Sequence, residues 1–198
     1  IEQTESGTLY ERLQKFIRQN EQNIPKKIAE ATPPRSDNWA YPVFTSLSGN
    51  KSDRFIERTY VAETSKLSAC AVLNSVTFTH KHTFKKENED EIRSYLDMIG
   101  EDDANFRNRI LTIEGKGKNV NYVRLLVPIA TALTGSTAGI DMTATSDYRE
   151  FAFTLETPIG GTTSKNITYI TQVPGCKKTE SLSWYRQPGL KYVNFISR

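Results

Sequence analysis

The only two histidines of the chain, His80 and His82, are the residues whose type and spacing most directly suggest chemistry. They stand two positions apart in a strand-like run, so both imidazoles point to one side, as histidine pairs do in several metal sites. Catalytic zinc needs a third protein ligand, which here would be a carboxylate or a cysteine. The alternative is that both rings belong to a half-buried strand face shared with Phe78 and Phe84. The sequence favours that alternative, and no cofactor is expected.

The two cysteines lie far apart in the chain, in different local contexts. Cys70 is in the strand-like run 68–73, and Cys176 follows Pro174 and Gly175 in a turn-like run. A bond between them would raise the free energy of unfolding by about 4–5 kcal/mol, if the gain comes from the entropy that the unfolded chain loses when the loop is closed. Since an exposed thiol at Cys176 is a liability, we expect a Cys70–Cys176 disulfide. A disulfide indicates a secreted, periplasmic or particle-borne protein.

Acidic residues are concentrated in residues 87–103. This block holds eight acids and one arginine, a net charge of −7, and therefore leaves +10 on the rest of a chain whose total is +3. One interpretation is an acidic patch that docks on a basic surface, including that of an identical neighbour. The alternative, a solvated helix face whose first-turn acids complement the helix dipole, is the commoner case. The acids are Glu87, Glu89, Asp90, Glu91, Asp97, Glu101, Asp102 and Asp103.

Basic residues follow this block without forming a stripe. Arg107, Arg109, Lys116 and Lys118 surround the glycine-containing run 115–119, which the pattern predicts to be a hairpin turn between strands 109–114 and 120–127. With nearby aromatic residues they would form a surface that neutralises phosphates and stacks on bases. No nucleic-acid-binding signature accompanies them, so a nucleic-acid module or viral coat subunit is the weakest interpretation.

Motifs for nucleophilic catalysis are incomplete in this sequence. The run 135–139 has threonine where a nucleophile elbow needs serine, and residues 115–118 lack the phosphate-binding loop spacing. An enzyme normally shows an acid, base, nucleophile or metal set. The sequence therefore disfavours an enzyme.

Two amphipathic helices are expected among mostly extended segments. Leu9, Leu13, Phe16 and Ile17 form one apolar stripe in an N-terminal helical segment, residues 1–34, which the prolines at 33 and 34 end. A second helix near 87–100 has its stripe at Ile92, Tyr95, Leu96 and Ile99, with glycine at 100 as its stop.

Period-two alternation dominates the remainder, residues 35–198. Strands are expected at 54–63, 76–84, 149–156, 167–173 and 192–196, with 149–156 paired to 167–173 across the turn 158–161. Threonine, with 22 residues, supports extended structure. The sequence predicts an α+β fold, a mostly antiparallel β-sheet with an N-terminal and an internal amphipathic helix.

Composition limits the class of protein further. The chain has 198 residues, 37% hydrophobic and 25% charged residues, and a mean hydropathy of −0.54. These values are those of a folded domain without a membrane-spanning segment. The leading hypothesis is a non-enzymatic structural or interaction protein, such as an envelope, secreted or particle-forming subunit. A metal-binding module or metalloenzyme using His80 and His82 is the alternative.

Overall fold

The computed structural model describes residues 37–176, 182–184, 187 and 193–197. The chain divides into a unit of residues 1–35 and a unit of residues 36–198, and all described residues belong to the second unit. The predicted helix in residues 1–34 lies outside the described residues.

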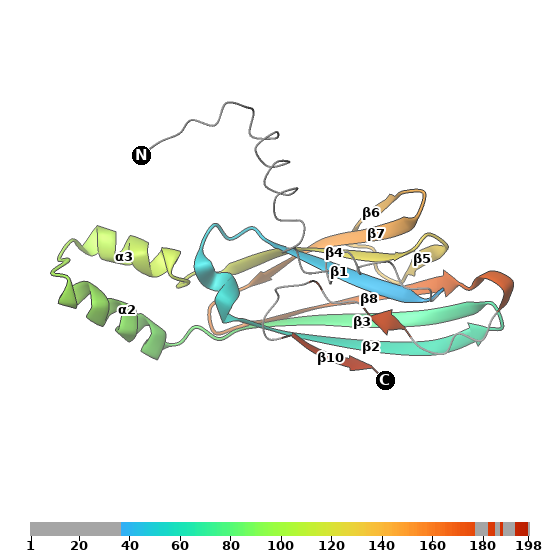
Figure 1. Cartoon of the computed structure of the whole chain (residues 1–198), viewed down its shortest axis with the longest axis horizontal. Helices are drawn as coiled ribbons and strands as arrows, with labels where there is room; N and C mark the ends of the chain where they lie inside the picture. The colour runs from blue at the N-terminus through green and yellow to red at the C-terminus, as the bar shows by residue number, and fades with distance from the viewer. Residues whose placement is uncertain (1–36, 177–181, 185–186, 188–192, 198) are drawn as a thin grey trace, which may run out of the picture. The chain divides into compact units, whose positions relative to one another are not determined.

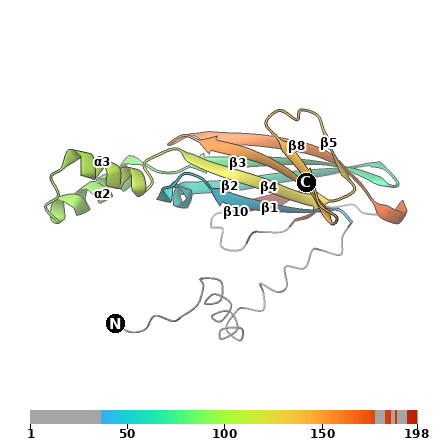
Figure 2. The same ribbon diagram turned by 90° about the horizontal axis from the view of Figure 1, so that it is seen from above.

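Two five-stranded sheets face each other in this unit (Figures 1 and 2). The first has the order β6-β7-β4-β1-β9, and the second the order β10-β2-β3-β8-β5. The first sheet contains β1 (Trp39–Ser46), β4 (Asn119–Pro128), β6 (Asp141–Ala144), β7 (Tyr148–Thr157) and β9 (Ser183–Trp184). The second contains β2 (Ile56–Ser68), β3 (Ala71–His82), β5 (Thr131–Thr134), β8 (Thr162–Gln172) and β10 (Val193–Ser197). Neighbouring strands are antiparallel, except that β9 runs parallel to β1 and β10 parallel to β2.

The core fills the space between the sheets because their central strands, β3 and β4, alternate between buried and more exposed residues. Residues of β3 and β4 are buried at every second position, which gives each sheet one apolar face. Phe78 is in the middle, with its ring 5.2 Å from that of Tyr60 and 5.3 Å from that of Phe153. Such edge-to-face pairs add to the free energy of burying the rings. The prediction that β3 turns Phe78, His80, His82 and the flanking apolar residues to one side is confirmed, since all are buried.

The expectation of one sheet with strands 149–156 and 167–173 paired is wrong. β7 and β8 follow each other along the chain, but β7 pairs with β4 and β6, whereas β8 pairs with β3 and β5. The turn between them crosses from one sheet to the other. The coarser prediction, a mostly antiparallel β-rich structure with helices, is confirmed.

Two helices are inserted between β3 and β4: α2 (Lys86–Met98) and α3 (Ala104–Ile113). They form an antiparallel pair that extends past the end of the sheets (Figures 1 and 2). The internal helix near 87–100 is thus present as α2, but the predicted strand 109–114 is wrong because residues 109–113 belong to α3 and Glu114 caps its end. Two short 3-10 helices complete the described elements, η2 (Lys51–Phe55) beside the base of the helix pair and η3 (Pro174–Cys176) after β8.

The C-terminal residues cover one edge of each sheet. β9 pairs with the start of β1, and β10 pairs with β2. Further along β1, the side-chain amide of Gln187 accepts from the Phe44 N–H at 2.6 Å and donates to the Phe44 carbonyl at 3.3 Å. A side chain here makes the two bonds that a neighbouring strand would make, which protects an otherwise open edge.

Candidate functional site

The α2–α3 hairpin owes its shape to capping residues at both turns. Gly100 has a φ of 72°, its N–H donates to the Asp97 carbonyl, and the Glu101 N–H donates to the Leu96 carbonyl. This Schellman arrangement ends α2, and the Asp103 carboxylate starts α3 by accepting from the N–H of Asn105 at 2.8 Å. The chain therefore reverses within residues 99–103.

A second Schellman motif ends α3 where the hairpin rejoins the two sheets. Gly115, with a φ of 116°, ends α3, and the Lys116 N–H donates to the Leu111 carbonyl at 2.9 Å. A Cβ atom at Gly115 would lie 2.5 Å from the Phe55 ring, a closer approach than real side chains make. Only glycine fits both the backbone conformation and this contact.

Few side chains hold the two helices together. Leu96 and Leu111 are the buried apolar residues of the hairpin. Arg107 joins the helices by an ion pair with Asp97 at 2.6 Å and by donating to the Glu101 carbonyl at 2.7 Å. These contacts leave much of the apolar surface of the hairpin in solvent.

Large apolar side chains are exposed on the hairpin to an unusual degree. Five of the eleven large apolar residues exposed in the described part of the chain lie between positions 95 and 113. In the apolar stripe of α2, Leu96 is buried, whereas Tyr95 is 58% exposed and Ile99 is 53% exposed. Concentrated apolar exposure of this kind marks interaction surfaces. The five residues are Tyr95, Met98, Ile99, Phe106 and Ile113.

A groove of about 390 Å³ lies along α2, between α3 and η2. Ile92, Tyr95, Ile110 and Phe55 give it apolar walls. Polar residues complete its lining: Arg54, Asn88, Glu91 and Glu114. The guanidinium of Arg54 lies 4.7 Å from the centre of the Phe55 ring and pairs with the Glu114 carboxylate at 3.2 Å. The groove thus combines an apolar surface with carboxylates.

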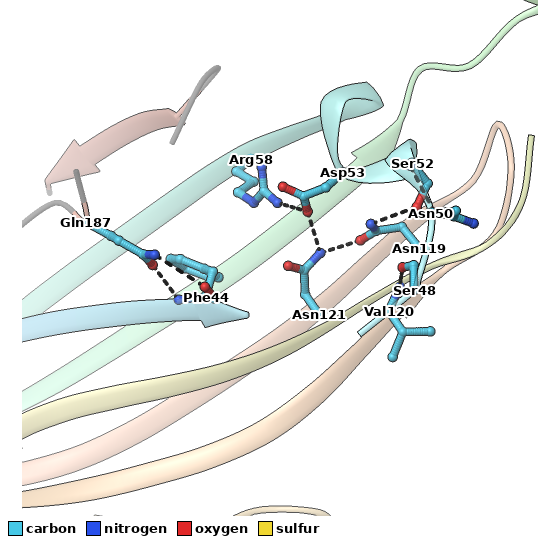
Figure 3. Close-up of polar contacts among 10 residues, drawn as sticks. All are labelled: Phe44, Ser48, Asn50, Ser52, Asp53, Arg58, Asn119, Val120, Asn121 and Gln187. Atoms are coloured by element: carbon cyan, nitrogen blue, oxygen red, sulfur yellow. Dashed lines mark hydrogen bonds and ion pairs between the residues drawn. The ribbon is translucent and has the colours of Figure 1, made fainter. Parts of the chain in front are cut away.

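A buried polar network fixes η2, and with it one wall of the groove (Figure 3). Arg58, only 1% exposed, pairs with Asp53, whose carboxylate also accepts from the Asn121 amide at 3.3 Å. Asn121 donates to Asn119, which donates to the Ser52 hydroxyl at 3.1 Å. The network joins η2 to β2 and β4, so the groove rests on both sheets.

The histidines of the metal hypothesis lie in the core. His82 is 2% exposed; its Nε2 is 3.0 Å from the Gly117 carbonyl, and its Nδ1 accepts from the Phe84 N–H at 3.2 Å. Both ring nitrogens are therefore engaged with the backbone. His80 is fully buried beside Phe44, and neither of its ring nitrogens has a hydrogen-bond partner within the described part of the chain. The expected half-buried face is in fact a buried one.

The surroundings of the two histidines do not complete a metal site. No group of three histidine, cysteine, aspartate or glutamate residues suited to a metal occurs among the described residues. Burial, followed by the charge of Arg58, lowers the pKa of His80 to about 3, and burial also lowers the pKa of His82. Both rings are thus neutral near pH 7.

The acidic and basic residues singled out in the sequence partly neutralise one another. Glu89 binds Arg93 and Lys116, each at 2.7 Å, and these hydrogen bonds lower the pKa of its carboxyl group. Asp90 pairs with Lys86. The other partners are Asp97 with Arg107 and Lys118 with Glu156, while Asp103 caps α3 and Glu101 accepts from the Asp103 N–H. Glu87, Glu91, Asp102 and Arg109 take part in no salt bridge within the described residues.

The cysteines are joined as expected. The Cys70–Cys176 disulfide connects the turn between β2 and β3 to η3. Cys70 itself lies in that turn and not in a strand, which corrects the sequence expectation. Within the described residues, no helix has the length and apolar character to cross a membrane.

Comparison with known proteins adds no relative. No protein-family model, no curated protein sequence and no solved structure matches this chain.

Proposed function

We propose that this protein is a non-enzymatic structural or interaction protein, a secreted, envelope or particle-forming subunit, whose contact surface is the α2–α3 hairpin. The observation that carries the proposal is the cluster of five exposed apolar side chains on an element that extends past the sheets. Because the hairpin buries only two apolar residues, its other apolar side chains remain in solvent and lower the solubility of the protein. A partner bound to this surface would cover them.

Charge gives the expected chemistry of the partner. Residues 86–114 hold nine acidic and four basic residues, a net charge of −5, so the rest of the chain carries +8. An acidic surface with exposed apolar side chains is complementary to a basic, amphipathic surface. The rest of this chain is positively charged, so a second copy could provide that basic surface. The disulfide supports a location outside the reducing cytosol.

The proposal is tested by the association state of the full chain. Sedimentation velocity over a range of concentrations should show self-association that weakens as salt rises, because salt screens the opposite charges. The double variant Met98→Asp/Ile99→Asp should associate much less, since it places two charges on the exposed surface.

Leu67→Asp/Met142→Asp is the matched control, because it adds the same two charges at residues that are also exposed, at 51% and 53%, but that lie in β2 and β6 outside the hairpin. It should associate like the unmodified chain. A chain that stays monomeric at every concentration and salt would overturn the proposal.

A further inference from the structure

The groove along α2 can receive apolar side chains from one face of a helix. The residues that α2 contributes, Asn88, Glu91, Ile92 and Tyr95, are spaced i, i+3, i+4 and i+7 and so form one stripe about 10 Å long. Ile110 of α3 lies on the other side of the groove. A groove of this kind takes the apolar face of an amphipathic helix, with anchors at the same spacing. Of its two carboxylates, Glu114 pairs with Lys51 and Arg54, whereas Glu91 takes part in no salt bridge within the described residues and so favours a helix that carries positive charge.

One segment of the chain itself has these properties. Residues 8–18 lie outside the described residues, so their sequence alone carries this step. Leu9, Leu13, Phe16 and Ile17 are spaced i, i+4, i+7 and i+8, which predicts an apolar helical stripe. The segment has three basic residues and one acidic residue, a net charge of +2.

We propose that residues 8–18 of one copy bind in the α2–α3 groove of a second copy. The segment and the hairpin carry opposite net charges, +2 for residues 8–18 and −5 for residues 86–114, and the described residues leave the groove open. A pocket of about 390 Å³ accommodates the side chains of two anchors such as Leu13 and Phe16. This inference rests on the proposed function and names its partner.

The contact is heterologous, because the segment and the groove are different surfaces. Each copy offers one segment and one groove, so successive copies join head to tail and form either a closed ring or an open filament. If the protein forms particles, we therefore expect them to be built from head-to-tail contacts.

Complementation between two full-length variants tests the proposal. Leu13→Asp disables the segment and keeps the groove, whereas Tyr95→Asp disables the groove and keeps the segment. Sedimentation velocity should show that each variant alone associates about tenfold or more weakly than the unmodified chain, because an aspartate replaces a buried apolar anchor. An equimolar mixture should form a complex of two chains and grow no further, since it contains one intact segment and one intact groove.

Matched controls place the same charge one position away. Gln14→Asp and Ser94→Asp are expected to lie off the apolar stripe and off the groove, and both should assemble like the unmodified chain. Since Tyr95 is 58% exposed, Tyr95→Asp should also retain its melting temperature, which circular dichroism checks.

Three outcomes would overturn the inference: a mixture that remains monomeric, a segment variant that assembles normally, or an unmodified chain that is always monomeric. In the first two cases, if Met98→Asp/Ile99→Asp still abolishes association, the proposed function stands and only the partner segment is wrong. In the third case both proposals fall.

Discussion

Arg58 is a buried cation that forms a salt bridge with one carboxylate among the described residues. It is 1% exposed and pairs with Asp53, whose side chain is 35% exposed. We expect Asp53→Asn to lower the free energy of unfolding by about 2–3 kcal/mol, because a buried charge loses its counter-charge. Urea denaturation measures this loss.

The double variant Asp53→Asn/Arg58→Met provides the control for this pair. It removes both charges and keeps an apolar side chain of similar length, so it should be more stable than Asp53→Asn alone. A double variant less stable than Asp53→Asn would show that Arg58 contributes chiefly through its packing.

His80 makes the fold sensitive to acid. Its pKa is about 3 in the folded chain, against an ordinary value of about 6.5 in the unfolded chain. Between these values only the unfolded chain binds the proton, so stability is complete above pH 6.5 and falls as the pH drops toward 3. His82, whose pKa is also lowered, acts in the same direction.

The substitution His80→Leu should therefore reduce the pH dependence of stability. Between pH 6 and pH 5 the unmodified chain should lose about 1 kcal/mol more than the variant does. Urea denaturation of both chains at the two pH values measures the difference. Equal losses would show that His80 is protonated equally in the folded and unfolded chains.

Among the elements, the α2–α3 hairpin depends on two glycines with different surroundings. Gly100 and Gly115 both have positive φ, but a Cβ at Gly100 meets nothing within 4 Å, whereas at Gly115 it meets the Phe55 ring. We expect Gly100→Ala to lower the free energy of unfolding by about 1 kcal/mol, through backbone strain alone. Gly115→Ala should lower the free energy of unfolding by about 2–3 kcal/mol, because a steric clash with the Phe55 ring is added to that strain. Thermal unfolding of the two variants compares them, and equal costs would mean that Phe55 moves aside freely.

The sequence predicts α2 correctly and α3 wrongly, for a physical reason visible in both helices. Acids in the first turn and Gly100 at the end mark α2. In α3 the short run 109–114 has apolar residues at Ile110, Leu111 and Ile113, and a run of that length fits strand and helix alike. The signals that distinguish them are Asp103, which caps the first turn, and Gly115, which ends the last. The exposed groove was not predictable, because an apolar stripe does not say whether a partner covers it.

For the whole molecule, alternation identifies the strands but not the sheet to which each belongs. The inward residues of β7, such as Phe151 and Phe153, and those of β8, such as Ile167 and Tyr169, enter the same core from opposite sheets. Their patterns are therefore equivalent, and the short turn between the strands resembles a hairpin. Pairing is decided by contacts with β3 and β4, which are distant in sequence and leave no local signal.

The disulfide is the one covalent constraint across this long-range topology. It joins residues 106 positions apart, and the loop that it closes contains the hairpin and most strands of both sheets. Cys70→Ala/Cys176→Ala should lower the free energy of unfolding by about 4–5 kcal/mol, since the unfolded chain gains the freedom of that loop. Urea denaturation with and without reductant tests this: reductant should bring the unmodified chain to the stability of the variant and leave the variant unchanged. If reductant has no effect on the unmodified chain, the bond does not contribute to the stability of the fold.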